Sequence, residues 1–288
     1  MTVVVTGGLG FIGKHLVEVL SSKGKDVLII DRKIGKSVNN SRIKILNIDI
    51  RNRDKLEEIE KKDVEEVYHL AAKVSVPESF EKPVEYFNIN TVGSSNIFET
   101  FKDSKILYVS SAAVYGHCKK LPIKETYELS PLSPYGLSKM LAEESAKEYI
   151  RLYGSNITIV RPFNVYGPGQ KNNQYAGVVS IFLEQWKKGK ALTVRGDGNQ
   201  VRDFVHVKDV CEAMIKVMGK KDVFNVASGK KTRIIDLARM ISDKIKFVPE
   251  ISGEIKYSWA DIKKIKRTGW RPKIPLKKGI EELKELHV

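Results

Sequence analysis

The N-terminal segment constrains the fold most strongly, because a short apolar run leads directly into a glycine-rich turn and then into an amphipathic helix. Thr2-Val3-Val4-Val5 predicts a buried strand, Thr6-Gly7-Gly8-Leu9-Gly10-Phe11-Ile12-Gly13 follows at once, and the helix is expected to reach about Lys23. Glycines at these positions allow a tight turn, a close approach of the backbone to a pyrophosphate, and close packing of the helix on the strand. The N-terminal end of the helix would then bind the phosphate charge. The strand before the glycines and the helix after them favour a dinucleotide site over a merely structural turn.

The second strand ends in an acidic residue, which indicates the kind of dinucleotide. This strand is expected over 26–30, and Asp31 follows it, 18 residues beyond Gly13. A carboxylate at this point accepts hydrogen bonds from both ribose hydroxyls and repels a 2′-phosphate, so it favours NAD over NADP. Arg32 and Lys33 come next, and they are either plain surface charges or groups that would tolerate NADP.

Strands alternate with helices along the first 160 or so residues. This alternation predicts the α/β class, with a doubly wound and mostly parallel sheet of the Rossmann type. Further strands are expected at 43–46, 64–68, 106–109 and 223–226, and helices over 84–101 and 134–153.

Three of these strands end in residues that suit a ligand lying across the sheet edge. Asp49-Ile50 would contact an adenine, and His69-Leu70-Ala71-Ala72 offers small side chains beside which a dinucleotide can lie, although the alanines would also serve tight packing. Ser111 follows the strand over 106–109, where open α/β sheets bind ligands. It could hydrogen-bond a reacting alcohol, but alone it would be an ordinary turn serine.

The segment Ser133-Pro134-Tyr135-Gly136-Leu137-Ser138-Lys139 opens the helix expected over 134–153. Residues four apart lie about one turn apart on one helix face, so Tyr135 and Lys139 project together. An ammonium beside a phenol favours the phenolate and lowers its pKa from about 10 toward neutrality, which would let the tyrosine take a proton from an alcohol. The same spacing occurs by chance in many helices, so its meaning depends on the motifs around it.

Composition excludes several classes of protein. A chain of 288 residues with 42% hydrophobic and 30% charged residues can bury a substantial core, and without a long apolar run or a signal peptide we expect a cytoplasmic protein that uses no membrane. Two cysteines, Cys118 and Cys211, and five scattered histidines predict no metal site. The net charge of +15 invites a nucleic-acid interpretation, but lysines alternate with glutamates, as over 55–66, so we favour solvated surfaces and attraction of an anionic substrate.

Several longer motifs occur in a fixed order along the chain. They are TGGLGFIG, Asp31, Asp49-Ile50, HLAA, NTVG, SSAAVYG, SPYGLSK, RPFNVYGPGQ and GDGNQVRDFVHVKDV. In order and spacing they resemble the extended short-chain dehydrogenase/reductase superfamily, and within it most closely the NAD-dependent UDP-glucose 4-epimerases and related nucleotide-sugar epimerases. The resemblance runs from Thr2 to about Glu285.

The resemblance implies roles for particular residues. Catalytic roles fall to Ser111, Tyr135 and Lys139. A nucleotide sugar, with UDP-hexose as the expected substrate, would be contacted by Ser111, Asn164, Val178, Arg195 and Arg202. NAD would be held by Gly7, Gly10, Phe11, Ile12, Gly13, Asp31, Arg32, Asp49, Ile50, Leu70, Ala71, Ala72, Lys73, Asn90, Tyr135, Lys139 and Phe163.

The resemblance also implies a reaction and an architecture. Tyr135 would remove the proton of the sugar 4-hydroxyl as hydride passes to NAD, and the 4-keto sugar would turn over and take hydride back on its other face. Residues 1–163 and 203–246 would form the NAD-binding Rossmann domain. Residues 164–202 and 247–288 would form a smaller nucleotide-sugar lobe. A homodimer is implied through the helices that carry Asn90 and Tyr135.

Some positions depart from the pattern of the superfamily. Its 4,6-dehydratases carry an Asp-Glu pair where this chain has Ala112 and Ala113, whose methyl groups cannot move a proton. Ile251 replaces a phosphate-binding arginine, and Arg195 replaces an aromatic residue that covers the base. Ser258 matches a gate position, and a small residue there leaves N-acetylated sugars open as substrates.

Three functions therefore stand in order of preference. The first is a nucleotide-sugar 4-epimerase in which NAD is regenerated at each turnover. The second is a net NAD-dependent oxidoreductase that acts on another sugar or on a small alcohol or carbonyl compound. The third is a non-catalytic nucleotide-sensing or RNA-binding protein, which the net charge suggests and which the presence of both Tyr135 and Lys139 opposes.

Overall fold

The computed structural model describes residues 2–33, 40–170, 177–250, 253 and 255–286. Its centre is a parallel sheet of seven strands in the order β11-β6-β5-β4-β1-β2-β3, which confirms the expected doubly wound α/β class. The strands are β1 (Thr2–Thr6), β2 (Asp26–Asp31), β3 (Ile43–Asn47), β4 (Val64–His69), β5 (Lys105–Val109), β6 (Asn156–Pro162) and β11 (Val223–Val226).

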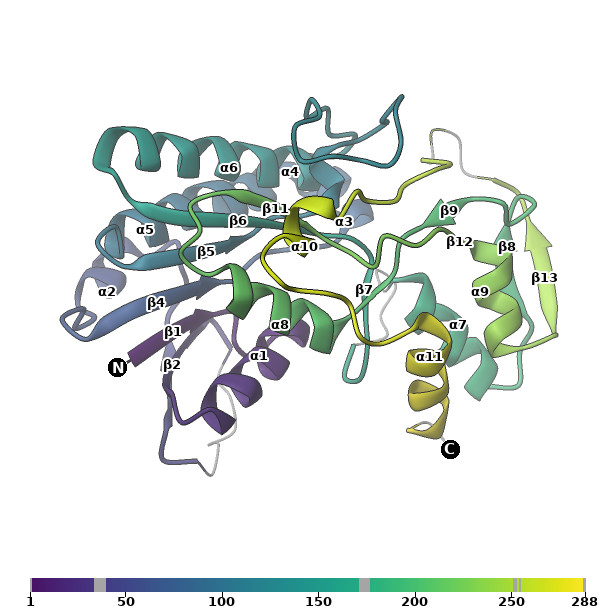
Figure 1. Cartoon of the computed structure of the whole chain (residues 1–288), viewed down its shortest axis with the longest axis horizontal. Coiled ribbons are helices and arrows are strands. Elements are labelled where there is room, and N and C mark those ends of the chain that lie inside the picture. The colour runs from purple at the N-terminus through teal and green to yellow at the C-terminus, as the bar shows by residue number, and fades with distance from the viewer. Residues whose placement is uncertain (1, 34–39, 171–176, 251–252, 254, 287–288) are drawn as a thin grey trace.

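Helices cover both faces of this sheet (Figure 1), and the burial of its strands follows from that. The apolar run of β1 is buried along most of its length, as a strand between two layers must be. On one face lie α1 (Phe11–Ser22) and α8 (Val207–Val217). On the other lie α2 (Arg53–Glu57), α4 (Pro83–Phe87), α5 (Gly93–Thr100) and α6 (Pro134–Tyr153), and the short α3 (Val76–Glu81) contacts α4 and α6.

The order of the strands creates a cleft at one edge of the sheet. The chain runs outward from β1 through β2 to β3 and then returns to β4 on the other side of β1. Neighbouring connections therefore leave the sheet in opposite directions at the carboxyl ends of β1 and β4. Ligands bind at such points in open α/β sheets.

A smaller lobe lies beyond this edge, on the right in Figure 1. It has its own apolar cluster, formed by side chains that include Phe182, Leu192, Leu237 and Ile280. Its helices are α7 (Val178–Lys187), α9 (Ile234–Ile241) and α11 (Leu276–Glu285), and its strands β8 (Leu192–Arg195) and β13 (Ile245–Val248) pair in parallel. Short pairs join β7 (Val165–Tyr166) to β10 (Val205–His206) and β9 (Val201–Arg202) to β12 (Thr232–Arg233).

The packing of two segments differs from the expected division of the chain. The segment 203–246 was assigned to the Rossmann domain, but its last part, α9, packs in the cluster of the smaller lobe. In the opposite sense, Ala260, Ile262 and Trp270 of the C-terminal segment 247–288 pack in the main core, and α10 (Lys263–Lys266) contacts β11. Amphipathic helices of similar composition suit either core, so the boundary between the domains stays a prediction.

The helix expected over 84–101 is interrupted. Between α4 and α5 the chain forms one wide π-helical turn, η1 (Asn88–Val92). Such a turn carries an extra residue and is frequent at functional sites. Here its middle residue, Asn90, is fully buried and faces the cleft-lining loop that follows β4.

Candidate active site

The glycine turn between β1 and α1 is built so tightly that side chains are excluded. Gly7 has φ +68, and a methyl group on it would lie 2.8 Å from the backbone of Ala71. A methyl group on Gly13 would lie 2.2 Å from the carbonyl oxygen of Gly7. Gly10 precedes α1 without a capping side chain, so the first amide groups of the helix are left to a ligand. These observations fit a pyrophosphate cradle.

Asp31 lies at the end of β2 with its carboxylate already oriented. The backbone amides of Leu9 and Lys33 donate to its two oxygens over 3.1 and 3.0 Å. This arrangement fixes the carboxylate at the rim of a pocket beside the glycine turn. The pocket is lined by Gly7, Gly10, Ile30, Asp31, Arg32, Lys33, Ile48, Asp49, Ile50, Leu70, Ala71, Ala72, Lys73 and Ile89.

Most of this lining belongs to the residues that the sequence assigns to the cofactor. Phe11, Ile12 and Gly13 form the first turn of α1 beside the pocket, with Gly13 buried. Lys33, considered above as a surface charge or a group that would tolerate NADP, also lines the pocket. Ile30, Ile48 and Ile89 were missed, and only their position next to predicted residues could have indicated them.

Asn90 contributes by holding the loop after β4 rather than by lining the pocket. Its side-chain amide accepts from the backbone amide of Lys73 over 2.8 Å and donates to the carbonyl of Lys73 over 2.9 Å. It also donates to the hydroxyl of Ser138 on α6 over 3.0 Å. The π-helical turn thus ties the cofactor loop to the helix that carries Tyr135 and Lys139.

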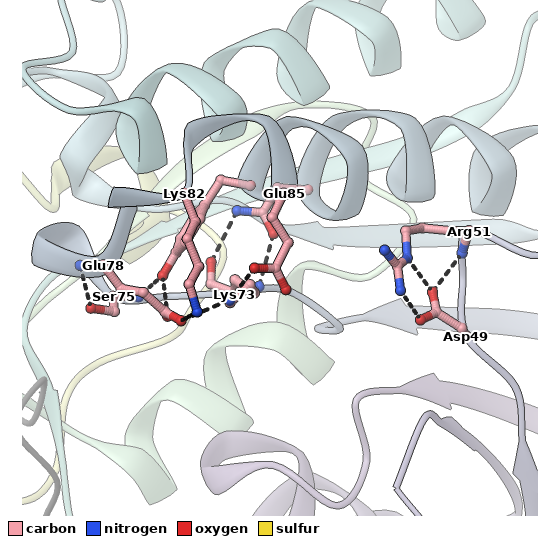
Figure 2. Close-up of polar contacts among 9 residues, drawn as sticks. Asp49, Arg51, Lys73, Ser75, Glu78, Lys82 and Glu85 are labelled. Atoms are coloured by element: carbon pink, nitrogen blue, oxygen red, sulfur yellow. Dashed lines mark hydrogen bonds and ion pairs between the residues drawn. The ribbon is translucent and has the colours of Figure 1, made fainter. Parts of the chain in front are cut away.

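The side chain of Lys73 is bound within the protein, as Figure 2 shows. Its ammonium lies 2.8 Å from a carboxylate oxygen of Glu78 and 2.8 Å from one of Glu85. Burial lowers the pKa of Lys73, but the two glutamates outweigh it, and the net shift is upward. Tyr86 donates to Glu78 over 3.0 Å, and its ring meets that of Tyr135 edge-on at 6.3 Å. Sequence reasoning missed Glu78, Glu85 and Tyr86. Glutamates on a helix usually face solvent, and neither they nor a single tyrosine form a distinctive motif.

Asp49 is likewise paired in Figure 2. Arg51 donates to both of its carboxylate oxygens, over 2.9 and 2.7 Å, and its backbone amide adds a third bond of 2.9 Å. The hydrogen bonds from Arg51 hold the pKa of Asp49 below its usual range. Asp49 therefore faces the pocket as an oriented carboxylate, next to Ile50.

The structure places two of the three expected catalytic side chains on one buried helix face and the third on the partly buried turn after β5. Tyr135 and Lys139 lie on the buried face of α6, 8% and 2% exposed, and Ser111 stands at the start of the short turn η2 (Ala112–Val114). The Ser111 hydroxyl accepts from the backbone amide of Ala113 over 3.1 Å and lies near enough to Tyr135 to act on its pKa. The Lys139 ammonium lies 4.4 Å from the centre of the Tyr108 ring.

The protonation of this group differs from the expectation. Burial raises the pKa of Tyr135, and the nearby Ser111 hydroxyl only partly opposes it. Burial also lowers the pKa of Lys139 to about 7, against the opposing charge of Glu143. The expected lowering of the Tyr135 pKa by Lys139 is therefore wrong for the protein alone, because removal of the phenol from water outweighs its neighbours.

The expected substrate residues are spread over several elements on the lobe side of the cleft. Phe163, which is expected to contact the cofactor, is buried directly after β6, with its ring centre 6.3 Å from that of Tyr115. The Asn164 side chain donates to the carbonyl of Asp203 over 2.9 Å. Val178 begins α7, Arg195 ends β8 with an exposed side chain, and Arg202 ends β9.

Asp203 joins this region to the C-terminal segment. Its buried carboxylate accepts from the amide and hydroxyl of Ser228, from the amide of Gly229 and from the amide of Ala260. Asn164 binds the carbonyl of the same residue. One aspartate thus links β9, the end of β11 and the C-terminal segment.

Comparison with known proteins assigns the chain to a family. The model of the NAD-dependent epimerase/dehydratase family matches residues 3–227. A "Putative UDP-glucose 4-epimerase" of Methanocaldococcus jannaschii is 42% identical over 98% of this chain and 96% of that protein. The chain belongs to the NAD-dependent epimerase/dehydratase family.

Solved structures agree with the assignment of this chain to the family. The UDP-N-acetylglucosamine 4-epimerase of Methanobrevibacter ruminantium, in complex with UDP-N-acetylmuramic acid, has a TM-score of 0.91 at 35% identity and is matched over 99% of this chain and 98% of that chain. The UDP-glucose 4-epimerase of Thermus thermophilus, in complex with NAD, has a TM-score of 0.91 at 31% identity, over 100% and 99%. The expectations of an epimerase-like enzyme and of NAD as its cofactor are confirmed.

The departures from the family pattern can be located in this epimerase/dehydratase. Ala112 and Ala113 form the turn after Ser111 together with Val114, so neither of the two matching positions carries a group that could transfer a proton. The backbone amide of Ser258 donates to the carbonyl of Val201, which holds this gate position beside β9. Ile251 lies outside the described residues.

Two further findings concern metal ions and membranes. Within the described ranges, no three His, Cys, Asp or Glu side chains are grouped to hold a metal ion. No helix in the same part of the chain is both long and apolar enough to cross a membrane.

Proposed function

We propose that this protein is an NAD-dependent nucleotide-sugar 4-epimerase that acts on a UDP-hexose. The observation that carries the proposal is the link from α6, which carries Tyr135 and Lys139, through Ser138 and Asn90 to the loop at Lys73. That loop lines a pocket whose glycine turn and Asp31 suit NAD. The names of the relatives and structural neighbours support a UDP-sugar substrate and a reaction at C4.

NAD fits the pocket by steric and by chemical criteria. The turn leaves no space for a Cβ at Gly13, and the amides at the start of α1 are open to a pyrophosphate. The Asp31 carboxylate suits two ribose hydroxyls and opposes a 2′-phosphate. When bound, NAD would accept a hydride from C4 of the sugar and return it.

The side chains of this chain would handle the proton. Tyr135 would accept the proton of the 4-hydroxyl, with Ser111 hydrogen-bonded to the same oxygen. Lys139, protonated, would stabilise the phenolate that Tyr135 needs. The same three groups would return the proton to the other epimer, since the reaction is reversible.

The diphosphate would be held from the lobe side, so that the hexose can turn between its two orientations. Arg202 would supply charge-assisted hydrogen bonds, and Arg195 could stack on the base or add positive charge. Asn164 donates one N–H of its side-chain amide to the carbonyl of Asp203, so its second N–H is available to a diphosphate oxygen. Ser258 leaves room at the gate, which favours N-acetylated hexoses as additional substrates.

The test is to incubate the purified protein with UDP-glucose, UDP-galactose and their N-acetyl counterparts, each without added reductant, and to separate the epimers. We expect interconversion that reaches the same ratio from either member of a pair. Steady conversion of external NAD to NADH with an alcohol substrate would instead support the net oxidoreductase. Absence of epimers from all four substrates would reject the proposal.

We also propose a homodimer through α4, η1 and α6. Val84, Val92, Leu141 and Leu152 are exposed apolar side chains on these helices. Their burial against a second copy would remove apolar area from water. Light scattering coupled to gel filtration should give twice the 32.5 kDa mass, and a monomeric mass would contradict the proposal.

A further inference from the structure

A third buried ionisable side chain follows Tyr135 and Lys139 along α6. Glu143 lies one helical turn beyond Lys139 and is fully buried. Sequence reasoning assigned it no role, because a glutamate within a helix is usually a surface residue. A carboxylate buried beside an ammonium needs an explanation, since both groups lose their hydration.

Arg161 fixes the position of this carboxylate. From β6, its Nε donates to the two oxygens of Glu143 over 2.9 and 3.2 Å, and its Nη2 donates to Oε2. The pair is almost completely buried, at 3% and 0% side-chain exposure. Glu143 therefore cannot turn away from its place next to Lys139.

Arg161 is held in turn by groups behind the active site. Its Nη1 donates to the hydroxyl of Tyr115 over 2.8 Å and to the carbonyl of Glu125 over 3.1 Å. The Tyr115 hydroxyl donates to the side-chain oxygen of Asn225 over 2.7 Å, and the backbone amide of Asn225 donates to the Glu125 carboxylate over 2.9 Å. We call these five residues (Glu125, Glu143, Tyr115, Arg161 and Asn225) the rear cluster.

The rear cluster joins the segments that carry the site. Tyr115 follows the turn after Ser111, and Arg161 precedes Phe163 by two residues on β6. Its position is therefore fixed relative to all three catalytic side chains.

The groups that face Lys139 identify Glu143 as its anionic neighbour. His69 on β4 is neutral, because burial lowers its pKa to about 3. Tyr108 on β5 is neutral, because burial raises its pKa well above the usual value. Arg161 on β6 is cationic and forms an ion pair with Glu143. Glu143 is the carboxylate whose charge acts on Lys139.

We propose that Glu143 is a positioning residue that supplies the counter-charge for Lys139, and that Arg161 and the rear cluster hold it there. Glu143 is thus the buried carboxylate between two buried cations, Lys139 and Arg161, and the partly exposed Glu125 adds a second negative charge behind Arg161. Protonated Lys139 would then persist in a site from which water is excluded, and it is this form that assists Tyr135.

The proposal rests on the role proposed for Lys139, but its main test needs no substrate. In protein labelled with 13C at lysine Cε, the Lys139 signal is assigned by its absence from Lys139→Met and is titrated against pH. In Glu143→Gln, which keeps the shape and removes the charge, we expect the midpoint of Lys139 to fall by about one pH unit. The alkaline limit of kcat should move down with it while the KM for the sugar is retained. An unshifted Lys139 midpoint in an active epimerase would contradict the role of Glu143 alone. A shifted midpoint in a protein without epimerase activity would contradict the proposed function alone.

The matched control is Glu144→Gln on the same helix, whose carboxylate is exposed and paired with Lys147. Its Lys139 midpoint should equal that of the wild type. If Glu143→Gln does not fold, Glu143→Asp keeps the pair with Arg161 in charge but draws the carboxylate back by one methylene, and the midpoint should fall by a smaller amount. An unchanged midpoint in whichever of these variants folds would overturn the proposal.

Discussion

The two sides of the cleft differ in how far their binding groups are fixed before any ligand arrives. On the cofactor side, the Asp31 carboxylate is held by two backbone amides and the loop at Lys73 is held by Asn90. On the lobe side, Arg195 is exposed, and the expected contacts come from separate short elements. A preorganised site loses less entropy on binding, so we expect NAD to bind tightly and the sugar to exchange readily.

Loss of the proposed proton acceptor should slow the chemical step without weakening binding on either side of the cleft. Tyr135→Phe is expected to lower kcat by about 10³-fold, because it removes general acid-base catalysis and little else. NAD affinity, followed by fluorescence titration, should stay nearly intact, because Tyr135 is one of many residues expected to contact NAD and only its hydroxyl is removed. Tyr153→Phe, an exposed tyrosine at the end of the same helix, is the control and should be fully active. Retained activity in Tyr135→Phe would reject the assigned role.

The next largest effect is expected on the cofactor side. In Gly13→Ala the new methyl group would lie 2.2 Å from the Gly7 carbonyl, so the turn must shift. Overpacking of this kind costs about 1–3 kcal/mol, and we expect NAD affinity to fall by about 10- to 100-fold. Calorimetric titration with NAD measures it. Gly177→Ala, where the new methyl would be 3.5 Å from the Gln170 side chain, should bind NAD normally.

The substrate side should respond separately. Arg202→Met removes a guanidinium proposed to bind the diphosphate, and charged hydrogen bonds contribute about 1.5–3 kcal/mol, so the KM for the sugar should rise by about 30-fold. NAD affinity should not change. Arg233→Met, on the paired strand β12 and bonded to Asp236, serves as the control. A loss of NAD affinity in Arg202→Met would contradict the separation of the two sides.

The smallest effect concerns the choice of dinucleotide. Asp31→Asn keeps the shape of the side chain but removes the charge that opposes a 2′-phosphate. We expect the ratio of NAD to NADP affinity to fall by about tenfold, an order-of-magnitude figure for one unscreened charge. Asp26→Asn, at the exposed start of the same strand, should leave the ratio unchanged. An unaltered ratio in Asp31→Asn would show that Arg32 and Lys33 already control selection.

The part of the cofactor side formed by the glycine turn and Asp31 could be predicted from the sequence, because its residues follow one another along a single strand-turn-helix-strand unit. Gly7, Gly10 and Asp31 are positioned by local backbone geometry, and all three line the pocket. Ile89 also lines it, but it comes from the π-helical turn, and no periodic pattern in the sequence predicted that turn.

The rest could not be predicted because it depends on tertiary burial. The pKa of Tyr135 is raised because α6 is covered on the face that carries it, and sequence spacing shows only that Lys139 is near. The ion pairs of Lys73 and Glu143 join residues from different elements, and the placement of α9 in the lobe depends on which core accepts its apolar face. Local pattern specifies elements well and specifies their partners poorly.

Asp203 ties the molecule together where the two lobes meet. Its carboxylate binds backbone or hydroxyl donors at Ser228, Gly229 and Ala260. An outward rigid-body rotation of the smaller lobe would break these hydrogen bonds and leave the Asp203 carboxylate without its donors. Opening and closing of the cleft should therefore be carried by surface loops and side-chain rotations, while the body of the enzyme melts as one cooperative unit.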